Sequence, residues 1–390
     1  MNKIAIYIDS EYNGSGGSQY TKALLNALIG LSTNNISLTV IYTRKGWDNH
    51  LNKIKNIKSI FFRNNSYLKR IYQILISLGC LLIAKIIAHK YDPIVEYIEN
   101  NNYDLVIFPS ADTLACLVNS KVVGTIHDLM HRYEKRFKES GSIFKYHYRD
   151  NYYQHLLLSS AAVLVDSNLG KRQVIESYSK IRANIFILPY IAPDYIYSKI
   201  IDNSYTSIIS DCCRKFLFYP AVFWPHKNHI NLIKAILILK ERGQLIDLYL
   251  GGKKQYEYKK LHKFVNENGL EEQVKFLGYI SYADMIYLYK NAFAMVMPTY
   301  FGPTNIPPIE AVMLNCPLII SNNYGMNEQC EDAAIYFNPN SSLEIAIAIE
   351  LLLTNNELRN NLLRNGIKIK EKFSQKRFET DIDNILQKLI

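Results

Sequence analysis

Short apolar runs alternate with amphipathic stretches along the whole chain. The runs are rich in Ile, Val and Leu, which is typical of buried strands. The stretches between them place apolar residues three and four positions apart, as in a helix with one buried face. Predicted strands cover 4–8, a run ending at 44, 57–62, 104–108, 122–126, 161–165, 185–189, 216–219, 245–250, 274–277, 292–297 and 317–321. Predicted helices cover 20–31, 144–158, 169–179, 230–242, 258–268, 283–290, and stretches beginning at 309 and near 342.

This alternation predicts parallel sheets with helices on both faces. The chain has 390 residues, more than the roughly 250–300 that one core supports. Residues 190–211 lack periodicity and are rich in Asp, Asn, Ser and Tyr, so we expect a linker there. The predicted fold is therefore α/β, with two tandem Rossmann-like, doubly wound domains over 1–195 and 212–372, joined by a linker at 196–211.

Composition and charge narrow the class of partner. Apolar residues make up 48% and charged residues 21% of the chain, as in a globular protein. The net charge of +10 favours an acidic partner, such as a nucleoside diphosphate or an anionic membrane surface. The basic residues are scattered and no nucleic-acid motif is present, so nucleic acid is excluded. The six cysteines form no CxxC pair or metal-ligand spacing, and no secretory leader is visible, so we expect core cysteines, no metal and a cytoplasmic protein.

The stretch 71–88 is nearly apolar and raises the question of a membrane. It is short for a spanning helix and contains Gln73 and Lys85. Two alternatives remain, a helix buried against a sheet and a helix lying in a membrane interface between basic flanks. We favour the buried helix.

A proline-rich loop between the strand at 292–297 and the helix from 309 carries candidate chemistry. Glu310 falls in the first turn of that predicted helix, where it can accept hydrogen bonds from ligand hydroxyls. The amides of Thr304, Asn305 and Ile306 precede it and could bind an anion. The alternative is a stiff strand-to-helix connection whose Glu only caps the helix.

The first strand is followed by a glycine-rich turn. Gly14, Gly16 and Gly17 lie between it and a helix, an arrangement that presents backbone amides to a phosphate. The dinucleotide fingerprint requires a glycine where Gln19 stands, and the second strand ends without an acid, so NAD binding is disfavoured. A plain tight turn remains the alternative.

Other polar residues end strands on the same predicted edge. His127 and Asp128 follow the strand at 122–126, and Lys227 immediately precedes a helix. In parallel sheets ligands bind beyond the carboxyl ends of the strands. Each residue alone has an ordinary structural explanation, but together they predict a site for an anionic substrate.

The sequence resembles the family-4 group of retaining, nucleotide-sugar-dependent glycosyltransferases, which have the GT-B fold. The resemblance rests on 220–229 (PAVFWPHKNH), on Gly251-Gly252 and on 301–311 (FGPTNIPPIEA), with support from 125–128 (TIHD). It departs from the family at two positions. Gly302 replaces the first of two glutamates, and Val222 replaces an arginine for which His226 would partly substitute.

The resemblance implies a role for each candidate residue. Lys227 would stabilise the leaving diphosphate, Glu310 would bind the donor ribose, and His127 would approach the donor sugar near its reacting carbon. The amides of residues 304–306 would hold the sugar and phosphate, and the final helix, 373–389, would return to the first domain. The further substrate-binding residues implied are Gly14, Gly16, Gly17, Asp128, His226, Asn228 and Gly252.

The implied activity is transfer of a sugar, with retention, from a nucleoside diphosphate to a glycan hydroxyl. We expect a donor like GDP-mannose, with a UDP-sugar as the alternative, and no metal or other cofactor. The expected acceptor is a glycan on polyprenyl diphosphate, in bacterial O-antigen or capsule synthesis at the inner face of the plasma membrane. A nucleotide-sugar epimerase on the same fold and a non-catalytic scaffold of a polysaccharide assembly complex remain open.

Overall fold

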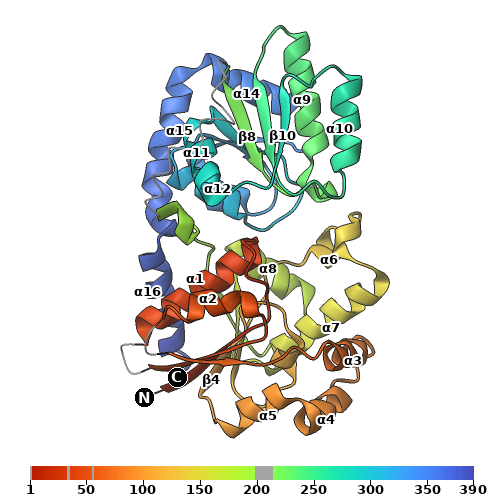
Figure 1. Cartoon of the computed structure of the whole chain (residues 1–390), viewed down its shortest axis with the longest axis vertical. Coiled ribbons are helices and arrows are strands. Elements are labelled where there is room, and N and C mark those ends of the chain that lie inside the picture. Colours follow the sequence, from red (N-terminus) through yellow and green to blue (C-terminus); the bar gives the residue numbers. More distant parts are fainter. Residues whose placement is uncertain (1, 33–35, 55–56, 198–213) are drawn as a thin grey trace. The chain divides into compact units, whose positions relative to one another are not determined.

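The computed structural model describes residues 2–32, 36–54, 57–197 and 214–390, which form two compact units (Figure 1). The first unit comprises Met1–Ile191 and Gln375–Ile390, and the second comprises Ala192–Ser374. Residues 192–195 and 373–374, expected in the first domain, thus belong to the second unit. Most of the predicted linker, residues 198–211, lies outside the described residues.

The first unit is built on one parallel sheet in the order β3-β2-β1-β4-β5-β6-β7. Successive residues of β1, an interior strand, point to opposite faces of the sheet, so Ile4 and Ile6 enter one core cluster and Ala5 and Tyr7 the other. Burial on both faces explains why the strands are apolar without alternation. The strands are β1 (Asn2–Ile8), β2 (Ile36–Tyr42), β3 (Lys58–Phe61), β4 (Leu105–Ile107), β5 (Val122–Thr125), β6 (Ala162–Val165) and β7 (Asn184–Ile187).

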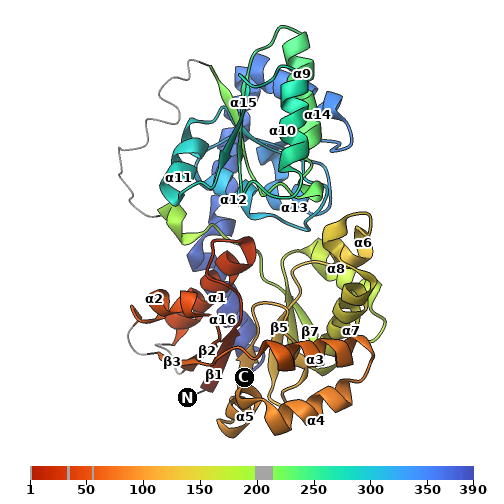
Figure 2. The same ribbon diagram turned by 45° about the vertical axis from the view of Figure 1, so that its right-hand side comes forward.

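Helices cover both faces of this sheet. The last helix, α16, lies beside α1 in both ribbon views, and its residues Phe378 and Ile382 belong to the same core cluster as Leu24 and Leu28 of α1 (Figures 1 and 2). Ser167 caps α8, since its Oγ accepts a hydrogen bond of 3.0 Å from the Gly170 amide. The helices are α1 (Gly16–Leu31), α2 (Asp48–Leu51), α3 (Ser66–Ser77), α4 (Leu81–Tyr91), α5 (Pro93–Asn100), α6 (Met130–Tyr133), α7 (Ile143–Ser159), α8 (Asn168–Ser177) and α16 (Gln375–Gln387).

The apolar stretch 71–88 is not the single buried helix that we favoured. It forms parts of two helices, α3 and α4, because the chain turns at Gly79, whose φ is +76°. Tyr72, Ile76, Ala84 and Ala88 are buried. Five large apolar side chains are exposed, namely Ile74, Leu78, Leu82, Ile83 and Ile86. Within the described residues, no helix has the length and apolar character needed to cross a membrane.

The second unit repeats the same architecture on a six-stranded parallel sheet, in the order β10-β9-β8-β11-β12-β13. Both sheets therefore have the doubly wound order that the sequence predicted. The strands are β8 (Phe216–Pro220), β9 (Asp247–Gly251), β10 (Val274–Gly278), β11 (Ala294–Met297), β12 (Leu318–Ser321) and β13 (Ala334–Phe337). The helices are α9 (His229–Glu241), α10 (Tyr258–Glu267), α11 (Tyr282–Asn291), α12 (Ile306–Met313), α13 (Met326–Cys330), α14 (Ser342–Thr354) and α15 (Asn356–Ile369).

Two helices begin earlier than predicted, and both lie next to candidate residues. The helix expected from residue 20 begins at Gly16, so Gly16 and Gly17 form its first turn instead of a loop. The helix expected from residue 309 begins at Ile306. Its first turn contains Pro307 and Pro308, whose fixed φ suits that position.

Candidate functional site

The candidate site of the second unit lies where strand order reverses, between β8 and β11. Such a switch point leaves a crevice beyond the carboxyl ends of the strands. The chain leaves β8 through a short 3-10 turn, Pro225–Lys227, and leaves β11 through residues 298–305. The two connections are joined directly, because the Tyr300 amide donates to the His226 carbonyl oxygen at 2.8 Å. Two motifs about seventy residues apart in sequence are thus brought into one loop cluster.

Lys227 is the cation of this cluster. Its Nζ donates a hydrogen bond of 3.2 Å to Asn305 Oδ1, and the residue is partly buried. No carboxylate among the described residues forms an ion pair with it. Burial lowers the pKa of the Lys227 ammonium to about 8. A positioned ammonium without a protein counter-ion is suited to receive an anionic ligand.

Asn305 orients Lys227 and is itself held by a residue that sequence reasoning missed. Gln329, on α13, accepts from the Asn305 amide at 3.0 Å and donates to the Asn305 carbonyl oxygen at 2.6 Å. The Asn305 amide is therefore engaged, and the prediction that it is free for an anion is wrong. Gln329 lies on a five-residue helix without a recognisable motif, so the sequence carried no signal for it.

Gly302 leaves no room for the glutamate that the family resemblance expects there. Its φ is +130°, and a β-carbon at this position would lie 2.4 Å from Asn305 Nδ2. The positive φ at residue 302 and the nearby side-chain amide of Asn305 together favour glycine at this position. The Asn305 side chain thus occupies the space where a glutamate side chain at residue 302 would begin, and its Oδ1 accepts a hydrogen bond from Lys227.

Glu310 lies in the second turn of α12, not in its first turn as predicted, because the helix begins at Ile306. Its carboxylate is buried and accepts two hydrogen bonds, from Tyr195 Oη to Oε1 at 2.6 Å and from Tyr289 Oη to Oε2 at 2.7 Å. Burial raises the pKa of Glu310, while the two hydroxyls oppose that shift. The carboxylate is therefore oriented by two tyrosines, neither of which the sequence analysis singled out.

The two tyrosines differ in how firmly they are held. Tyr289 is fully buried on α11. Tyr195 lies on a four-residue 3-10 turn, Asp194–Tyr197, and its ring stacks on the half-exposed ring of Tyr282 at 4.4 Å between centroids and 10° between planes. Tyr195 therefore covers Glu310 from a short connecting segment, whereas Tyr289 belongs to the core.

Two other predicted residues have structural roles. Asn228 is buried in a left-handed conformation, and its Nδ2 donates to the carbonyl oxygens of Pro298 and Pro339 at 2.9 and 2.7 Å. Its amide nitrogen therefore joins two loops, and its assignment as substrate-binding stays a prediction. At Gly252, φ is +144° and a β-carbon would lie 2.3 Å from the Ala221 carbonyl oxygen. This close approach of two backbones explains the glycine.

The remaining candidates belong to the first unit. His127 Nε2 lies 3.0 Å from the Pro109 carbonyl oxygen, and its Nδ1 lies 3.0 Å from Tyr190 Oη. Burial lowers the pKa of His127, which favours a neutral ring that donates from Nε2 and accepts at Nδ1. Asp128 accepts from the Met130 amide and pairs with Arg149, both at 2.8 Å. Burial alone would raise the pKa of Asp128, but the Arg149 guanidinium, the Met130 amide and His127 together lower it below its ordinary value.

The glycine-rich turn follows β1 at the switch point of the first sheet. Residues 11–17 are exposed, and Gly14 has φ of +72°. Ser15 precedes α1 without a side-chain cap, and a β-carbon at Gly17 would meet no atom within 4 Å. The start of α1 therefore presents backbone to solvent, as expected of a loop that a substrate approaches.

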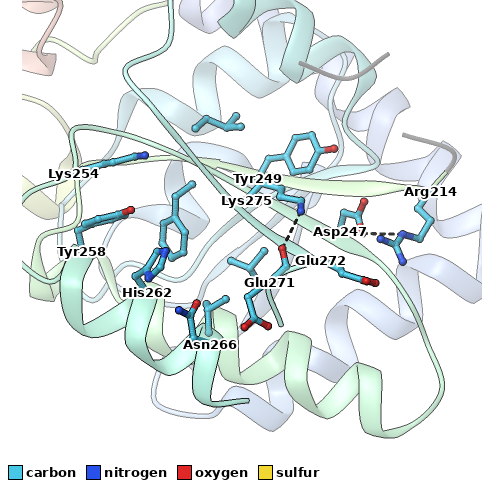
Figure 3. A pocket seen from close by; sticks show the side chains of 14 residues that line it. Arg214, Asp247, Tyr249, Lys254, Tyr258, His262, Asn266, Glu271, Glu272 and Lys275 are labelled. Atoms are coloured by element: carbon cyan, nitrogen blue, oxygen red, sulfur yellow. Dashed lines mark hydrogen bonds and ion pairs between the residues drawn. The ribbon is translucent and has the colours of Figure 1, made fainter. Parts of the chain in front are cut away.

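A pocket of about 860 Å³ elsewhere in the second unit is not this site. It lies along β10 and α10 (Figure 3) and contains none of the predicted residues. Arg214 pairs with Asp247 there at 3.0 Å, and Lys275 Nζ donates to the Glu271 carbonyl oxygen at 2.8 Å. Because this pocket contains none of the predicted residues, the loop cluster is the better guide to the chemistry of the second unit. Within the described ranges, no group of side chains suited to hold a metal is present.

The part of the chain that contains this loop cluster is similar to known glycosyltransferases. Residues 211–369 match the model described as glycosyl transferases group 1. The chain is 26% identical over 243 residues to O-antigen chain mannosyltransferase RfbU of Salmonella typhimurium, a match covering 60% of this chain and 65% of the relative. It is 26% identical over 170 residues to O-antigen chain mannosyltransferase B of Escherichia coli, covering 43% and 45%. The matches span less than two thirds of these relatives.

The fold has a counterpart among solved structures over its whole length. HepE of Anabaena, in complex with UDP and glucose, has a TM-score of 0.70 and 17% sequence identity, with 100% of both chains covered. At this identity the likeness concerns the fold. Residues 211–369 therefore belong to the glycosyl transferases group 1 family, and the chain that contains them has the GT-B fold of glycosyltransferases.

Proposed function

We propose that the protein is a retaining glycosyltransferase that moves a sugar from a nucleoside diphosphate to a hydroxyl of a glycan acceptor. The observation that carries this proposal is Lys227, an ammonium at the switch point of the second sheet that pairs with no carboxylate of the described residues. Glu310, five residues after the Asn305 that orients Lys227, supplies a carboxylate suited to ribose hydroxyls. The second unit therefore contains both a cation for the diphosphate and a carboxylate that can accept hydrogen bonds from the ribose.

The proposed chemistry needs no carboxylate pair. The bond between the anomeric carbon and the β-phosphate oxygen breaks, its electron pair goes to the phosphate, and the sugar becomes cation-like. The acceptor hydroxyl adds to the same face and gives its proton to the departing phosphate oxygen. Lys227 stabilises the charge on that phosphate, a contribution of about 3–4 kcal/mol by comparison with single oxyanion donors. We propose no metal in this step.

For the donor and acceptor, we propose mannose on GDP and a polyprenyl-diphosphate-linked glycan of O-antigen or capsule. Two relatives are named O-antigen chain mannosyltransferases, which favours mannose and O-antigen. HepE was solved with UDP and glucose, so UDP-sugars are the second donor class to test. Such an acceptor is carried by a lipid, and the enzyme would act at the cytoplasmic face of the membrane.

A panel of radiolabelled sugar nucleotides, incubated with and without a lipid-linked acceptor, tests the proposal. Acceptor-dependent release of nucleotide with label in the lipid fraction supports a transferase, and analysis of the anomeric product tests retention. Conversion of donor without acceptor would instead identify an epimerase. Lack of turnover with every donor would favour the non-catalytic scaffold.

Nucleotide affinity should depend on pH through Lys227. Its pKa of about 8 means that the ammonium is charged below pH 8 and loses its proton above it. The free nucleoside diphosphate carries the extra negative charge that the leaving group acquires, and only the charged form of Lys227 attracts that charge. The affinity for the free nucleoside diphosphate should therefore fall by up to about tenfold per pH unit above pH 8, whereas the affinity for the sugar-bearing donor should change far less. Titration calorimetry at pH 8.5 in two buffers of different ionisation enthalpy should also detect proton uptake on binding. Lys227→Arg should remove this pH dependence, and an affinity that stays constant up to pH 10 would contradict the assignment.

Removing the Tyr195 hydroxyl should strengthen nucleotide binding. Tyr195 covers Glu310 and donates to Oε1, so ribose has to displace it. Tyr195→Phe deletes that competing hydrogen bond and should lower the Kd for the nucleoside diphosphate about tenfold. Tyr289→Phe is the matched control, because Tyr289 is a core residue that need not leave, and it should give no gain. Weaker binding by Tyr195→Phe would mean that Tyr195 contacts the ligand.

A further inference from the structure

We propose that the exposed face of α3, α4 and the start of α7 docks on an anionic phospholipid bilayer. This surface, called the α3–α4 surface below, lies entirely within the first unit. The inference deepens the proposed function, on which it rests for the lipid-borne acceptor, but its physical argument uses only the first unit. Its members are Tyr67, Arg70, Ile74, Leu78, Leu82, Ile83, Ile86, Ile143 and Phe144.

The surface is apolar where a solvent-facing helix is normally polar. Leu78, Leu82 and Ile143 are 70%, 74% and 79% exposed, respectively. The exposed positions 67, 70 and 74 of α3, and Leu78 directly after its last residue, lie three or four residues apart, so they form one stripe. The opposite faces of both helices are packed, as Tyr72 and Ala84 show. Clustered exposure of this kind marks an interface rather than ordinary surface.

The three helices present these side chains as one continuous region. α3 packs against both α4 and α7, and the three helices lie together in both ribbon views (Figures 1 and 2). Ile74 of α3 and Phe144 of α7 line the same pocket, of about 470 Å³. Only Gly79 and Cys80 separate Leu78 from the beginning of α4. The apolar stripe of α3 therefore continues onto both neighbouring helices.

The charge of this region selects the partner. Residues 63–91 contain five basic residues and no Asp or Glu, which is half of the net charge of +10 on less than a tenth of the chain. Among the described residues, Arg63, Arg70, Lys85 and Lys90 form no ion pair. Basic residues beside exposed apolar side chains favour an anionic bilayer, where each adds to the attraction. If a second copy of the chain bound through the same surface, basic residues would face basic residues. A second copy is therefore a less suitable partner for the α3–α4 surface than an anionic bilayer.

The pocket provides a place for a lipid phosphate. Its lining includes Arg44, Lys69 and Arg70, together with Asn64, Ser66 and Gln73, and no acidic side chain. Lys69 is already paired with the partly buried Asp9 and the buried Asp112, and so holds α3 to the connections that follow β1 and β4. Arg70 is exposed and remains available to a phosphate. Ile74 and Phe144, at the same pocket, are placed to meet the apolar part of the lipid.

Vesicle sedimentation with the full chain tests the proposal. We expect binding to vesicles of phosphatidylcholine with phosphatidylglycerol, weakened by salt, and little binding to phosphatidylcholine alone. Arg70→Gln should reduce binding about fivefold. The double variant Leu82→Gln and Ile86→Gln should reduce it about tenfold or more. Matched controls are Arg172→Gln on α8, and Leu343→Gln with Ile347→Gln on α14, which have exposed side chains at the same spacing.

The outcomes separate this proposal from the enzymatic one. Equal losses in the α3–α4 variants and the controls, or equal binding to neutral vesicles, would overturn the docking surface. So would self-association without vesicles that the same variants abolish, because that would identify a second copy as the occupant. Vesicle binding without sugar transfer would support the docking surface and contradict the proposed glycosyltransferase activity. Sugar transfer to a soluble acceptor without vesicle binding would support the activity and contradict the docking surface.

Discussion

Lys227→Ala is expected to lower turnover about 10²–10³-fold while changing donor affinity far less. The ammonium is partly buried, held by Asn305 and without a carboxylate partner among the described residues, so its charge is available to the leaving diphosphate. The leaving phosphate carries more negative charge in the transition state than in the bound donor, and single donors to such a developing charge are worth about 3–4 kcal/mol. Steady-state kinetics with a labelled donor, beside calorimetric Kd values, separate the two effects.

Two further variants sharpen this test. Asn305→Ala keeps the charge but removes the group that orients it, so turnover should fall less than in Lys227→Ala. Lys227→Arg keeps the charge in a longer, forked group and should retain more activity than alanine. If Lys227→Ala weakened donor binding as much as turnover, the residue would bind ground state and transition state equally. The role in stabilising the leaving group would then be refuted.

Glu310→Gln is expected to weaken binding of the nucleoside diphosphate about 10–100-fold, with a smaller effect on turnover at saturation. Ribose hydroxyls donate to the carboxylate, and hydrogen bonds to charged groups are worth about 1.5–3 kcal/mol. Glutamine keeps the shape but presents an NH₂ group where one oxygen now faces a tyrosine hydroxyl. Calorimetry with GDP and UDP measures the loss.

Pyrophosphate is the matched ligand for this variant, because it lacks ribose. Its affinity should be unchanged or higher in Glu310→Gln, since the variant removes a negative charge near the site. An equal loss for pyrophosphate would indicate a disturbed loop cluster instead of a lost ribose contact. A thermal unfolding curve controls for the two buried tyrosine hydroxyls, whose partner changes.

Much of the fold could be predicted from the sequence because parallel sheets produce a simple pattern of apolar and amphipathic stretches. Strands covered on both faces are apolar throughout, and the amphipathic stretches between them form the covering helices. The same logic brings strand ends to one edge of each sheet, which is why Lys227 and the 301–311 loop were predicted to share a site. Errors arose at element ends. Prolines at the start of α12 and glycines at the start of α1 suggested loops, although both residue types tolerate the first turn.

The partners of the candidate residues were not predictable. Gln329 reaches Asn305 from α13, and Tyr195 reaches Glu310 from a connecting segment 115 residues earlier. Asn228 carries the same side chain whether it binds substrate or joins two loops, and only its burial shows that it joins them. The stretch 71–88 has a composition that fits a buried helix, and only the tertiary structure, with its turn at Gly79, shows that five of its large apolar side chains face solvent.

The sequence by itself determined the two doubly wound sheets, the edge at which their polar residues gather, and the identity of the cation and the carboxylate. It did so because strand burial and strand-to-helix connections depend on local pattern. The tertiary structure alone decided which side chains hold Asn305, which hydroxyls cover Glu310 and which apolar residues face solvent. These depend on contacts between segments far apart in the chain, and no local pattern specifies such contacts.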